Sequence, residues 1–286
     1  MLFKQVTIIG VGLIGGSLGL ALKKKKNVKT IVGYGRRRGA LHKAVSINAI
    51  DRYCLSLPKA VKDTELVLLA TPVGTFEALC RLMAPHLKPG TIVTDAGSVK
   101  GDFVDKLTAL LPDEIHFVGG HPIAGREKSG VMAATGVLYQ GCRTILTPTP
   151  YTNRAALEKV TALWESVGAK VAEIDPHDHD RILSFVSHLP HVVAYALMET
   201  MMHPRIAPLS PVEYSAGGLR DFTRIAASSP EMWRDIFLSN KKAVIEGIDA
   251  YQETIESIKK KILNDDGEGL IEIFKRANDI RGQATR

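Results

Sequence analysis

The chain has 286 residues, 45% hydrophobic and 23% charged, which is typical of one large or two ordinary globular domains and excludes a largely disordered protein. Its three cysteines are widely spaced and form no CxxC motif, which excludes a disulfide framework and a thiolate metal site and favours a cytoplasmic location. A net charge of +7 permits nucleic-acid binding, but the basic runs are dispersed and carry no interleaved aromatic residues. We therefore expect no nucleic-acid partner, and the positive charge suits an anionic small molecule.

An apolar run over residues 6–22 is followed by four lysines and resembles a signal peptide or a membrane anchor. Gly10, Gly12, Gly15 and Gly16 lie within this run and would weaken a membrane-spanning helix, and no small-residue cleavage site precedes the lysines. We therefore expect a protein without a membrane partner.

Short β-branched apolar segments alternate with amphipathic segments over the first 175 residues. The pattern predicts strands over residues 5–10, 30–34, 65–70, 91–96, 115–120, 142–147 and 170–174, and helices that include residues 75–87 and 154–168. Strands that alternate with helices favour right-handed crossovers and a parallel, doubly wound α/β sheet of the Rossmann type. A mixed edge of the sheet stays open at this point.

The pattern changes near residue 176, where Asp175 is a suitable helix N-cap and Pro176 suits the first helical position. No convincing strand follows, and the periodicity predicts helices only, including a long one over residues 232–262. We therefore expect a Rossmann domain over residues 1–175 and an all-α domain over residues 176–286, with a shared cleft.

The stretch "GVGLIGGS" has the GxGxxG spacing directly after an apolar strand and at the start of a helix. The first glycine suits the tight turn, the second lets backbone amides approach a pyrophosphate, and the third lets helix and strand pack closely. This context predicts a dinucleotide site rather than a merely glycine-rich turn. The cofactor contacts expected from this loop and from the end of the strand at 65–70 are Gly10, Gly12, Leu13, Ile14, Gly15, Thr71 and Pro72.

The end of the second strand reads "IVGYGRRRG", where an acidic residue would bind the ribose hydroxyls of NAD. Gly35 and Arg36 occupy this place, and Arg37 follows. Arginine pairs with the 2′-phosphate of NADP, so the sequence favours NADP over NAD. The alternative is a solvated basic turn that leaves NAD usable.

Three later polar clusters carry the remaining chemistry: "DAGSVK" at residues 95–100, "GGHPIAGREKSG" at 119–130 and "GGLRDFTRIA" at 217–226. The first two follow predicted strands, at the sheet edge where ligands of doubly wound folds bind. Together with "GVGLIGGSLG", "SHLPH" and "MWRDI", they resemble, in order, the motifs of the prephenate dehydrogenase family, which includes arogenate and cyclohexadienyl dehydrogenases of tyrosine biosynthesis. The resemblance implies oxidation of prephenate at its ring hydroxyl by NAD or NADP, loss of carbon dioxide to give 4-hydroxyphenylpyruvate, and a homodimer formed by the helical halves.

The resemblance implies that His121 accepts the hydroxyl proton, a role that suits an imidazole titrating near neutrality. A loop histidine facing water, on a tight turn between glycines, is the alternative. Ser98 resembles the family serine that orients this histidine and the substrate hydroxyl, and it also suits the N-cap of the helix that follows.

The substrate is a dicarboxylate, and Arg224 matches the family arginine that binds it. Glu127 and Asp221 resemble a pair that forms a polar gate with this arginine, or they are ordinary solvated carboxylates. By resemblance His191 is a substrate contact, while Trp233 is either near the active site or a core aromatic.

His188 and His191 are three residues apart and share one face of the predicted helix. Two histidines without a third ligand do not make a metal site, so we expect no metal. By resemblance, His188 is either a helix-packing residue or one that supports the substrate contacts from behind.

Several alternatives remain open on the sequence. One is an arogenate-preferring or dual-substrate enzyme, and another is a different hydroxy-acid dehydrogenase, although that class uses a lysine where "GGLRDFTRIA" offers arginines. A non-catalytic NADP-sensing or nucleic-acid-binding protein with the same fold is the third.

Overall fold

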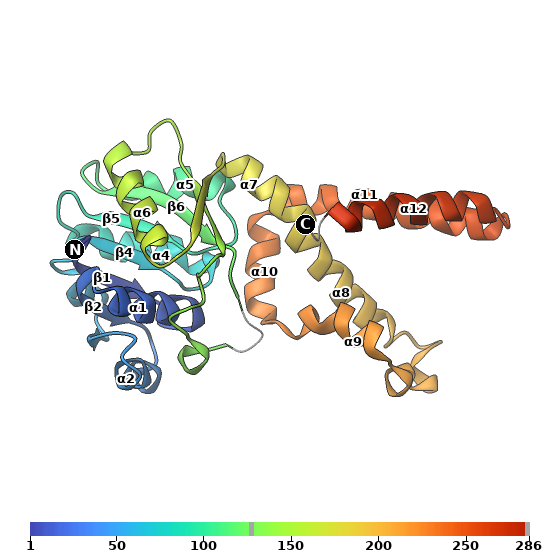
Figure 1. Ribbon diagram of the computed structural model, residues 1–286, viewed down its shortest axis with the longest axis horizontal. Coiled ribbons are helices and arrows are strands. Elements are labelled where there is room, and N and C mark those ends of the chain that lie inside the picture. The colour runs from blue at the N-terminus through green and yellow to red at the C-terminus, as the bar shows by residue number, and fades with distance from the viewer. Residues whose placement is uncertain (126–128, 284–286) are drawn as a thin grey trace. The chain divides into compact units, whose positions relative to one another are not determined.

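The computed structural model describes residues 1–125 and 129–283 of the chain (Figure 1). The chain divides into two compact units, Met1–Asn240 and Lys241–Arg286. The first unit contains the sheet and every residue of the candidate site described below.

An eight-stranded sheet forms the centre of the first unit, with the strand order β3-β2-β1-β4-β5-β6-β7-β8. Strands β1 to β6 run parallel, β7 is antiparallel to β6, and β8 is parallel to β7. The strands are β1 Phe3–Ile9, β2 Val28–Tyr34, β3 Arg52–Cys54, β4 Leu66–Leu69, β5 Ile92–Asp95, β6 His116–Pro122, β7 Arg143–Thr147 and β8 Lys170–Glu173. All seven predicted strands are confirmed, and the additional one, β3, has only three residues.

Helices cover both faces of this sheet because the central strands are apolar on both sides. Leu66 and Leu68 of β4 belong to one buried cluster, whereas Val67 and Leu69 belong to another. Successive residues of a strand point to opposite faces, so a continuous apolar run needs a cover on each face. The helices of this part are α1 Leu13–Lys25, α2 Arg38–Ser46, α3 Leu57–Val61, α4 Phe76–Met83, α5 Gly101–Thr108 and α6 Arg154–Ser166. The doubly wound Rossmann-type fold is confirmed.

After β8 the first unit is helical, as predicted. Its elements are α7 Pro176–Leu183, a π-helical turn at Ser184–His188, α8 Leu189–Thr200, α9 Gly217–Thr223 and α10 Pro230–Ser239. Asp175 caps α7 as predicted: its carboxylate accepts the backbone N–H groups of His177 and Asp178 at 2.8 and 3.2 Å. Pro190 explains the π turn, because proline has no N–H to donate and its ring clashes with the carbonyl four residues before it.

The continuous helical run Pro176–Thr200 is, within the described residues, the one helix long and apolar enough to cross a membrane by length and composition. A core helix of a soluble protein passes the same test.

The predicted long helix over residues 232–262 is wrong, because the structure has two helices that are separated at Asn240. Asn240 leaves the helical conformation, with φ −109° and ψ 38°, and is buried. Its side-chain Nδ2 donates to the backbone carbonyl of Asp180 in α7 at 2.9 Å. This long-range hydrogen bond stabilises the break, since asparagine readily exchanges helical geometry for hydrogen bonds to nearby backbone.

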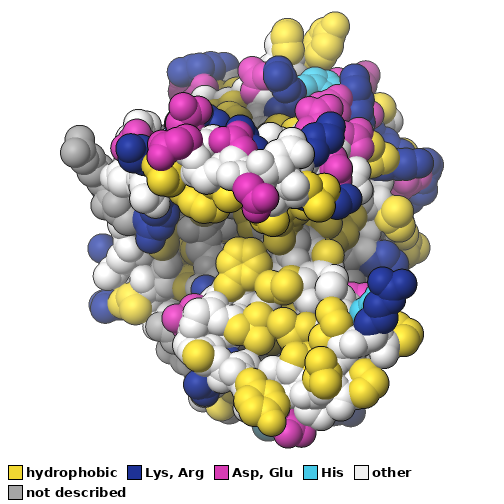
Figure 2. Space-filling view, turned by 90° about the vertical axis from the view of Figure 1, so that its right-hand side faces the viewer, with side chains coloured by type: hydrophobic (Ala, Val, Ile, Leu, Met, Phe, Trp, Pro, Cys, Tyr) yellow, Lys and Arg dark blue, Asp and Glu magenta, His cyan; other side chains and the backbone are white. Residues whose placement is uncertain are grey.

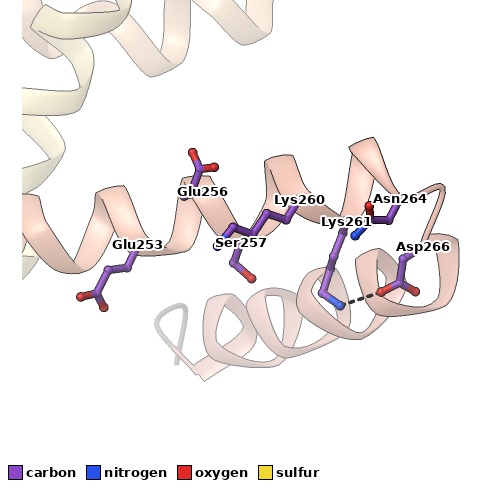
Figure 3. A pocket seen from close by; sticks show the side chains of 7 residues that line it. All are labelled: Glu253, Glu256, Ser257, Lys260, Lys261, Asn264 and Asp266. Carbon is purple, nitrogen blue, oxygen red and sulfur yellow. Dashed lines mark hydrogen bonds and ion pairs between the residues drawn. The ribbon is translucent and has the colours of Figure 1, made fainter.

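The second unit is a hairpin of two helices, α11 Lys241–Leu263 and α12 Gly267–Gln283. Asp265 adopts a left-handed conformation at the turn, with φ 54°. Figure 3 shows Lys261 of α11 reaching to Asp266, which directly precedes α12, and their charged atoms are 2.8 Å apart. The pocket drawn there is lined by side chains of mixed charge, including Glu253 and Lys260.

Candidate active site

The glycine loop after β1 has the geometry that its sequence predicts. Gly10 has φ +94°, a left-handed conformation that favours glycine, and a Cβ on it would lie 2.6 Å from the carbonyl oxygen of Ala70. A Cβ on Gly15 would lie 2.4 Å from the carbonyl oxygen of Gly10, so helix α1 packs directly on this loop. A Cβ on Gly12 would meet no atom within 4 Å, which leaves space for a ligand beside this glycine.

The first turn of α1 is oriented toward the same place. Gly12 is its N-cap, and Leu13 and Ile14 are its first residues. The first N–H groups of a helix have no partner within the helix, and together with the helix dipole they form a site for an anion. The hydroxyl of Tyr139 donates to the carbonyl of Ile14 at 2.6 Å and fixes this turn.

Thr71 and Pro72 follow β4, which lies beside β1 in the sheet. The Thr71 methyl group would lie 2.7 Å from a Cβ on Gly10, so the two loops are in contact. The Thr71 and Thr75 hydroxyls are 2.7 Å apart, and Thr75 also donates to the carbonyl of Pro72. These loops lie where the strand order reverses, between β1 and β4, the usual ligand position in such sheets.

Gly35 follows β2, and the end of that strand also lies beside the glycine loop, because Gly10 N–H donates to the carbonyl of Tyr34 at 2.9 Å. Arg36 and Arg37 are exposed. A Cβ on Gly35 would make only ordinary contacts with Leu41, at 3.6 Å or more. The basic turn is therefore accessible to a ligand that also contacts the glycine loop.

A buried ion pair holds the end of β5. Asp95 and Lys100 are each 1% exposed, and their charged atoms are 2.5 Å apart. The ammonium also donates to the carbonyls of Gly97 and Val99, while Asp95 Oδ1 accepts the N–H of Gly120 at 3.0 Å. The pair therefore connects the loop after β5 to β6, a role that the sequence did not indicate.

Ser98 lies in this loop and is half-buried. The prediction that it caps the following helix is wrong: the N-cap position of α5 is Lys100, and no side chain caps it. The reason is the buried Lys100 ammonium, whose contacts with Asp95, Gly97 and Val99 hold the loop in a compact turn before the helix begins.

His121 lies within strand β6 and not on a tight turn, opposite Ile145 of β7. It is 8% exposed, so the alternative of a loop histidine facing water is wrong. Its Nδ1 is 2.9 Å from Nε2 of His179 in α7, and the two rings meet edge to face with centroids 5.1 Å apart. Burial, followed by the charges of His179, Lys100 and His188, lowers the pKa of His121 well below its ordinary value.

His179 and Asp180 form the layer behind His121. His179 is fully buried, and its Nδ1 is 2.8 Å from Oδ1 of Asp180. The same carboxylate oxygen accepts the backbone N–H of Lys100 at 2.8 Å. Sequence reasoning missed both residues, because it considered only Asp175 and Pro176, as the start of a helix. The positions of His179 and Asp180 in the predicted helix could have indicated that they are buried, because they share a face with apolar residues. The buried residues of α7 are Pro176, His179, Asp180 and Leu183.

His188 and His191 both contact Trp233 of α10, so the prediction that they share one face is confirmed. His191 stacks on the indole with ring centroids 3.6 Å apart, and His188 meets it at 6.0 Å with an interplanar angle of 75°. Trp233 is 6% exposed and packs with Val99 and Ile236. Trp233 is therefore the core aromatic that the sequence offered as one alternative, and a position near the active site stays a prediction.

Burial lowers the pKa of His188 to about 4, although the charge of Asp180 opposes this shift. Burial also lowers the pKa of His191. The guanidinium of Arg224 lowers the pKa of His191 further, while the carbonyl of Ser187, which is 2.9 Å from Nδ1, raises it. Arg224 is thus close enough to act on this histidine.

Arg224 is exposed at the start of a short 3₁₀ turn, Arg224–Ala227. Asp221 is exposed on α9, one turn before it. Glu127 lies outside the described residues, so the gate formed by these three side chains stays a prediction. In the part of the chain that the structure describes, no group of three or more His, Cys, Asp or Glu side chains is placed to hold a metal ion.

Comparison with known proteins agrees with this geometry. Residues 18–173 match the family model for the nucleotide-binding domain of prephenate dehydrogenase, and residues 175–276 match the model for its dimerization domain. The chain is 38% identical to prephenate dehydrogenase of Bacillus subtilis over 96% of its length and 75% of that protein, and 35% identical to cyclohexadienyl dehydrogenase of Zymomonas mobilis over 98% and 95%. A crystal structure of prephenate dehydrogenase from Aquifex aeolicus, in complex with hydroxyphenyl propionate and NAD+, superposes with a TM-score of 0.92 at 39% identity and covers 98% of both chains. The expected resemblance is confirmed, and the chain belongs to the prephenate dehydrogenase family.

Proposed function

We propose that the protein oxidises prephenate with NAD or NADP and releases carbon dioxide and 4-hydroxyphenylpyruvate, a step of tyrosine biosynthesis. The observation that carries this proposal is the position of His121, a buried histidine with a lowered pKa at the carboxyl ends of the parallel strands, where the glycine loop also lies. A neutral imidazole accepts a proton, and hydride transfer from an alcohol requires an acceptor for the hydroxyl proton. The names of the relatives support the same reaction.

The residues present fit a dinucleotide. The pyrophosphate would lie in the space beside Gly12, against the first turn of α1 with Leu13 and Ile14. Gly10 and Gly15 would shape the loop, and Thr71 and Pro72 would contact the cofactor from β4. When bound, the nicotinamide supplies the acceptor for the hydride.

His121 takes the proton of the ring hydroxyl while the hydrogen on the same carbon leaves as hydride. The C–C bond to the ring carboxylate then breaks, its electron pair completes the aromatic ring, and carbon dioxide leaves. The ring oxygen ends as a phenol, so the proton held by His121 can return to it and the proton count balances. We assign to Ser98 the orientation of His121 and of the substrate hydroxyl.

Arg224 would bind a substrate carboxylate, because its planar fork matches that group. His191 and Trp233 would contact the substrate. The indole N–H of Trp233 is buried and, among the described residues, has no hydrogen-bond partner, so it is available to a substrate oxygen. Asp221 and Glu127 are proposed to gate the site.

We further propose a preference for NADP over NAD, because Arg36 and Arg37 are exposed beside the glycine loop and no carboxylate lies at the end of β2. Replacement of Arg36 by alanine should weaken NADP binding and leave NAD binding unchanged, as measured by fluorescence titration. Equal losses for both cofactors, or a wild-type protein that binds NAD more tightly, would contradict this preference.

We also propose a cytoplasmic homodimer with a Rossmann domain over residues 1–175 and a helical domain over residues 176–286. Figure 2 shows hydrophobic side chains gathered on one face of the molecule. Exposed apolar residues of the helical segments after β8 include Phe185, Val186, Met202, Leu209 and Phe222. The matching dimerization-domain model supports this assembly. Light scattering should give a mass close to twice the 31.1 kDa of one chain.

Nicotinamide reduction, followed by absorbance, tests the function. Prephenate and arogenate are each combined with NADP and NAD, and the expected result is fastest turnover of prephenate. His121→Asn should lower kcat by roughly 10²–10⁴-fold with cofactor binding retained. Near wild-type turnover of this variant would refute the role of His121. Cofactor binding without turnover of either substrate would refute the enzyme proposal and favour a sensing protein.

A further inference from the structure

We propose that His179 and Asp180 are positioning residues that hold His121 in the tautomer with its proton on Nδ1. This leaves Nε2 of His121 as the nitrogen that accepts the hydroxyl proton of the substrate. The proposal rests on the proposed function for its chemistry, but the tautomer follows from the hydrogen bonds alone.

The argument begins at Asp180. Its Oδ1 accepts the backbone N–H of Lys100 and lies 2.8 Å from Nδ1 of His179. An ionised carboxylate only accepts hydrogen bonds, so the hydrogen between Asp180 and His179 belongs to Nδ1 of His179. In a neutral imidazole the other nitrogen then carries a lone pair, and Nε2 of His179 is an acceptor.

The requirement that each hydrogen bond has one donor and one acceptor also determines the tautomer of His121. Its Nδ1 is 2.9 Å from Nε2 of His179, and two lone pairs cannot make a hydrogen bond. The hydrogen must therefore sit on Nδ1 of His121, and its Nε2 carries the lone pair. His121 is 8% exposed and His179 is fully buried, so little water competes for this contact.

The surroundings of the pair favour the neutral form of both rings. Burial lowers the pKa values of both histidines most, and the charge of Lys100, which faces both, lowers them further. His188 also faces His121, while Asp180 and Asp95 face His179 and oppose the shift of its pKa. A protonated His179 would donate from both nitrogens and would reverse the tautomer of His121. Activity should therefore be lost at low pH both by protonation of His121 and by this reversal.

Asp180 is itself held at two points, its carboxylate and its backbone carbonyl. The Lys100 N–H that it accepts comes from the loop held by the buried ion pair, and the backbone carbonyl of Asp180 accepts from Asn240 Nδ2 at 2.9 Å. The break between α10 and α11 thus helps to hold α7 where His179, backed by Asp180, meets His121.

Variants of His179 test the proposal. His179→Phe keeps a ring of similar size but offers no acceptor, so kcat should fall roughly tenfold to hundredfold while the KM for prephenate changes by less than about twofold. His179→Gln places an amide oxygen within reach of His121 and should recover a large part of this loss. His177→Gln is the matched control, because His177 lies on the same helix with a 62% exposed side chain and should leave kcat unchanged.

The tautomer itself is read by nitrogen NMR of the whole wild-type protein labelled at histidine, with the His121 signals assigned from the His121→Asn spectrum. We expect the proton on Nδ1 of His121, and a mixture of tautomers in His179→Phe. A wild-type proton on Nε2, or a folded His179→Phe protein with wild-type kcat, would overturn the proposal. If the wild type fails to turn over prephenate, the proposed function fails, whereas the NMR result still decides the tautomer.

Discussion

Replacement of Asp95 by asparagine tests how the buried ion pair holds the end of β5. The variant keeps the shape of the side chain, but it leaves the buried Lys100 ammonium without a counter-charge. It also removes an acceptor, because Oδ1 accepts the N–H of Gly120 and Oδ2 accepts the N–H of Gly97 as well as the ammonium. One of these donors would then face an NH₂ group.

The expected loss of stability is large. Removal of one partner of a buried ion pair costs about 3–5 kcal/mol, and an unsatisfied backbone N–H costs about 1–3 kcal/mol. The two costs overlap because they concern one side chain, so we expect the free energy of unfolding to fall by about 4 kcal/mol. Since a domain is stable by only about 5–15 kcal/mol, the variant should be clearly impaired at 37 °C.

Urea unfolding, followed by circular dichroism at one fixed protein concentration, measures this loss. Glu158→Gln in α6 is the matched control, because Glu158 pairs with Arg154 on the surface and its loss should change stability by less than about 0.5 kcal/mol. Asp95→Asn combined with Lys100→Met should recover part of the loss, since it also removes the uncompensated charge. An Asp95→Asn protein within about 1 kcal/mol of the wild type would refute this reasoning.

Two further predictions follow from the glycine loop and from the buried histidines. Gly12→Ala should fold normally, because its Cβ meets no atom within 4 Å, but it should weaken dinucleotide binding at least about tenfold. Gly15→Ala should instead lower the melting temperature, because its Cβ would lie 2.4 Å from the carbonyl oxygen of Gly10. Calorimetric titration and thermal unfolding check this pair, and equal effects of both variants on stability would contradict it. The pKa of His188 falls from 6.5 to about 4 on folding, so its titration costs no stability above pH 6.5, and the unfolded chain gains roughly 3 kcal/mol over the folded protein as the pH falls from 6.5 to 4. Urea midpoints measured across this range should fall with pH, and His188→Gln should flatten the profile.

Local sequence patterns predicted the sheet well, because all strands except β3 are marked by a short run of β-branched and other apolar residues. The run Leu66–Leu69 is apolar throughout because both of its faces are covered, and the glycine loop adds a strand-to-helix signature. Strand β3, Arg52–Cys54, has three residues and an exposed first position, which is too short for a periodic pattern.

Most predictions that failed depend on contacts between segments that are far apart in the sequence. Apolar periodicity continues across Asn240, and the break depends on a hydrogen bond to Asp180, sixty residues earlier in the chain. The family motif indicated His121, but its partner His179 is 58 residues away, and a local pattern does not reveal which strand a helix face will contact. The capping prediction for Ser98 failed for a local reason, because the buried contacts of Lys100 with Asp95 determine the path of that loop.

The proposed proton acceptor, His121, lies in the sheet, whereas the proposed substrate contacts lie in helical segments. Proton transfer and substrate recognition are thus carried by different parts of the first unit. The backbone of His121 is fixed within β6, which pairs with β5 and β7, whereas the proposed substrate contacts His191, Arg224 and Trp233 all belong to the helical segments. Substitutions at these three positions can therefore change which cyclohexadienyl acid fits without moving the proton acceptor, as long as His179 and Asp180 of α7 are kept. Substrate preference can drift in evolution, or be redesigned, while the reaction itself is inherited unchanged.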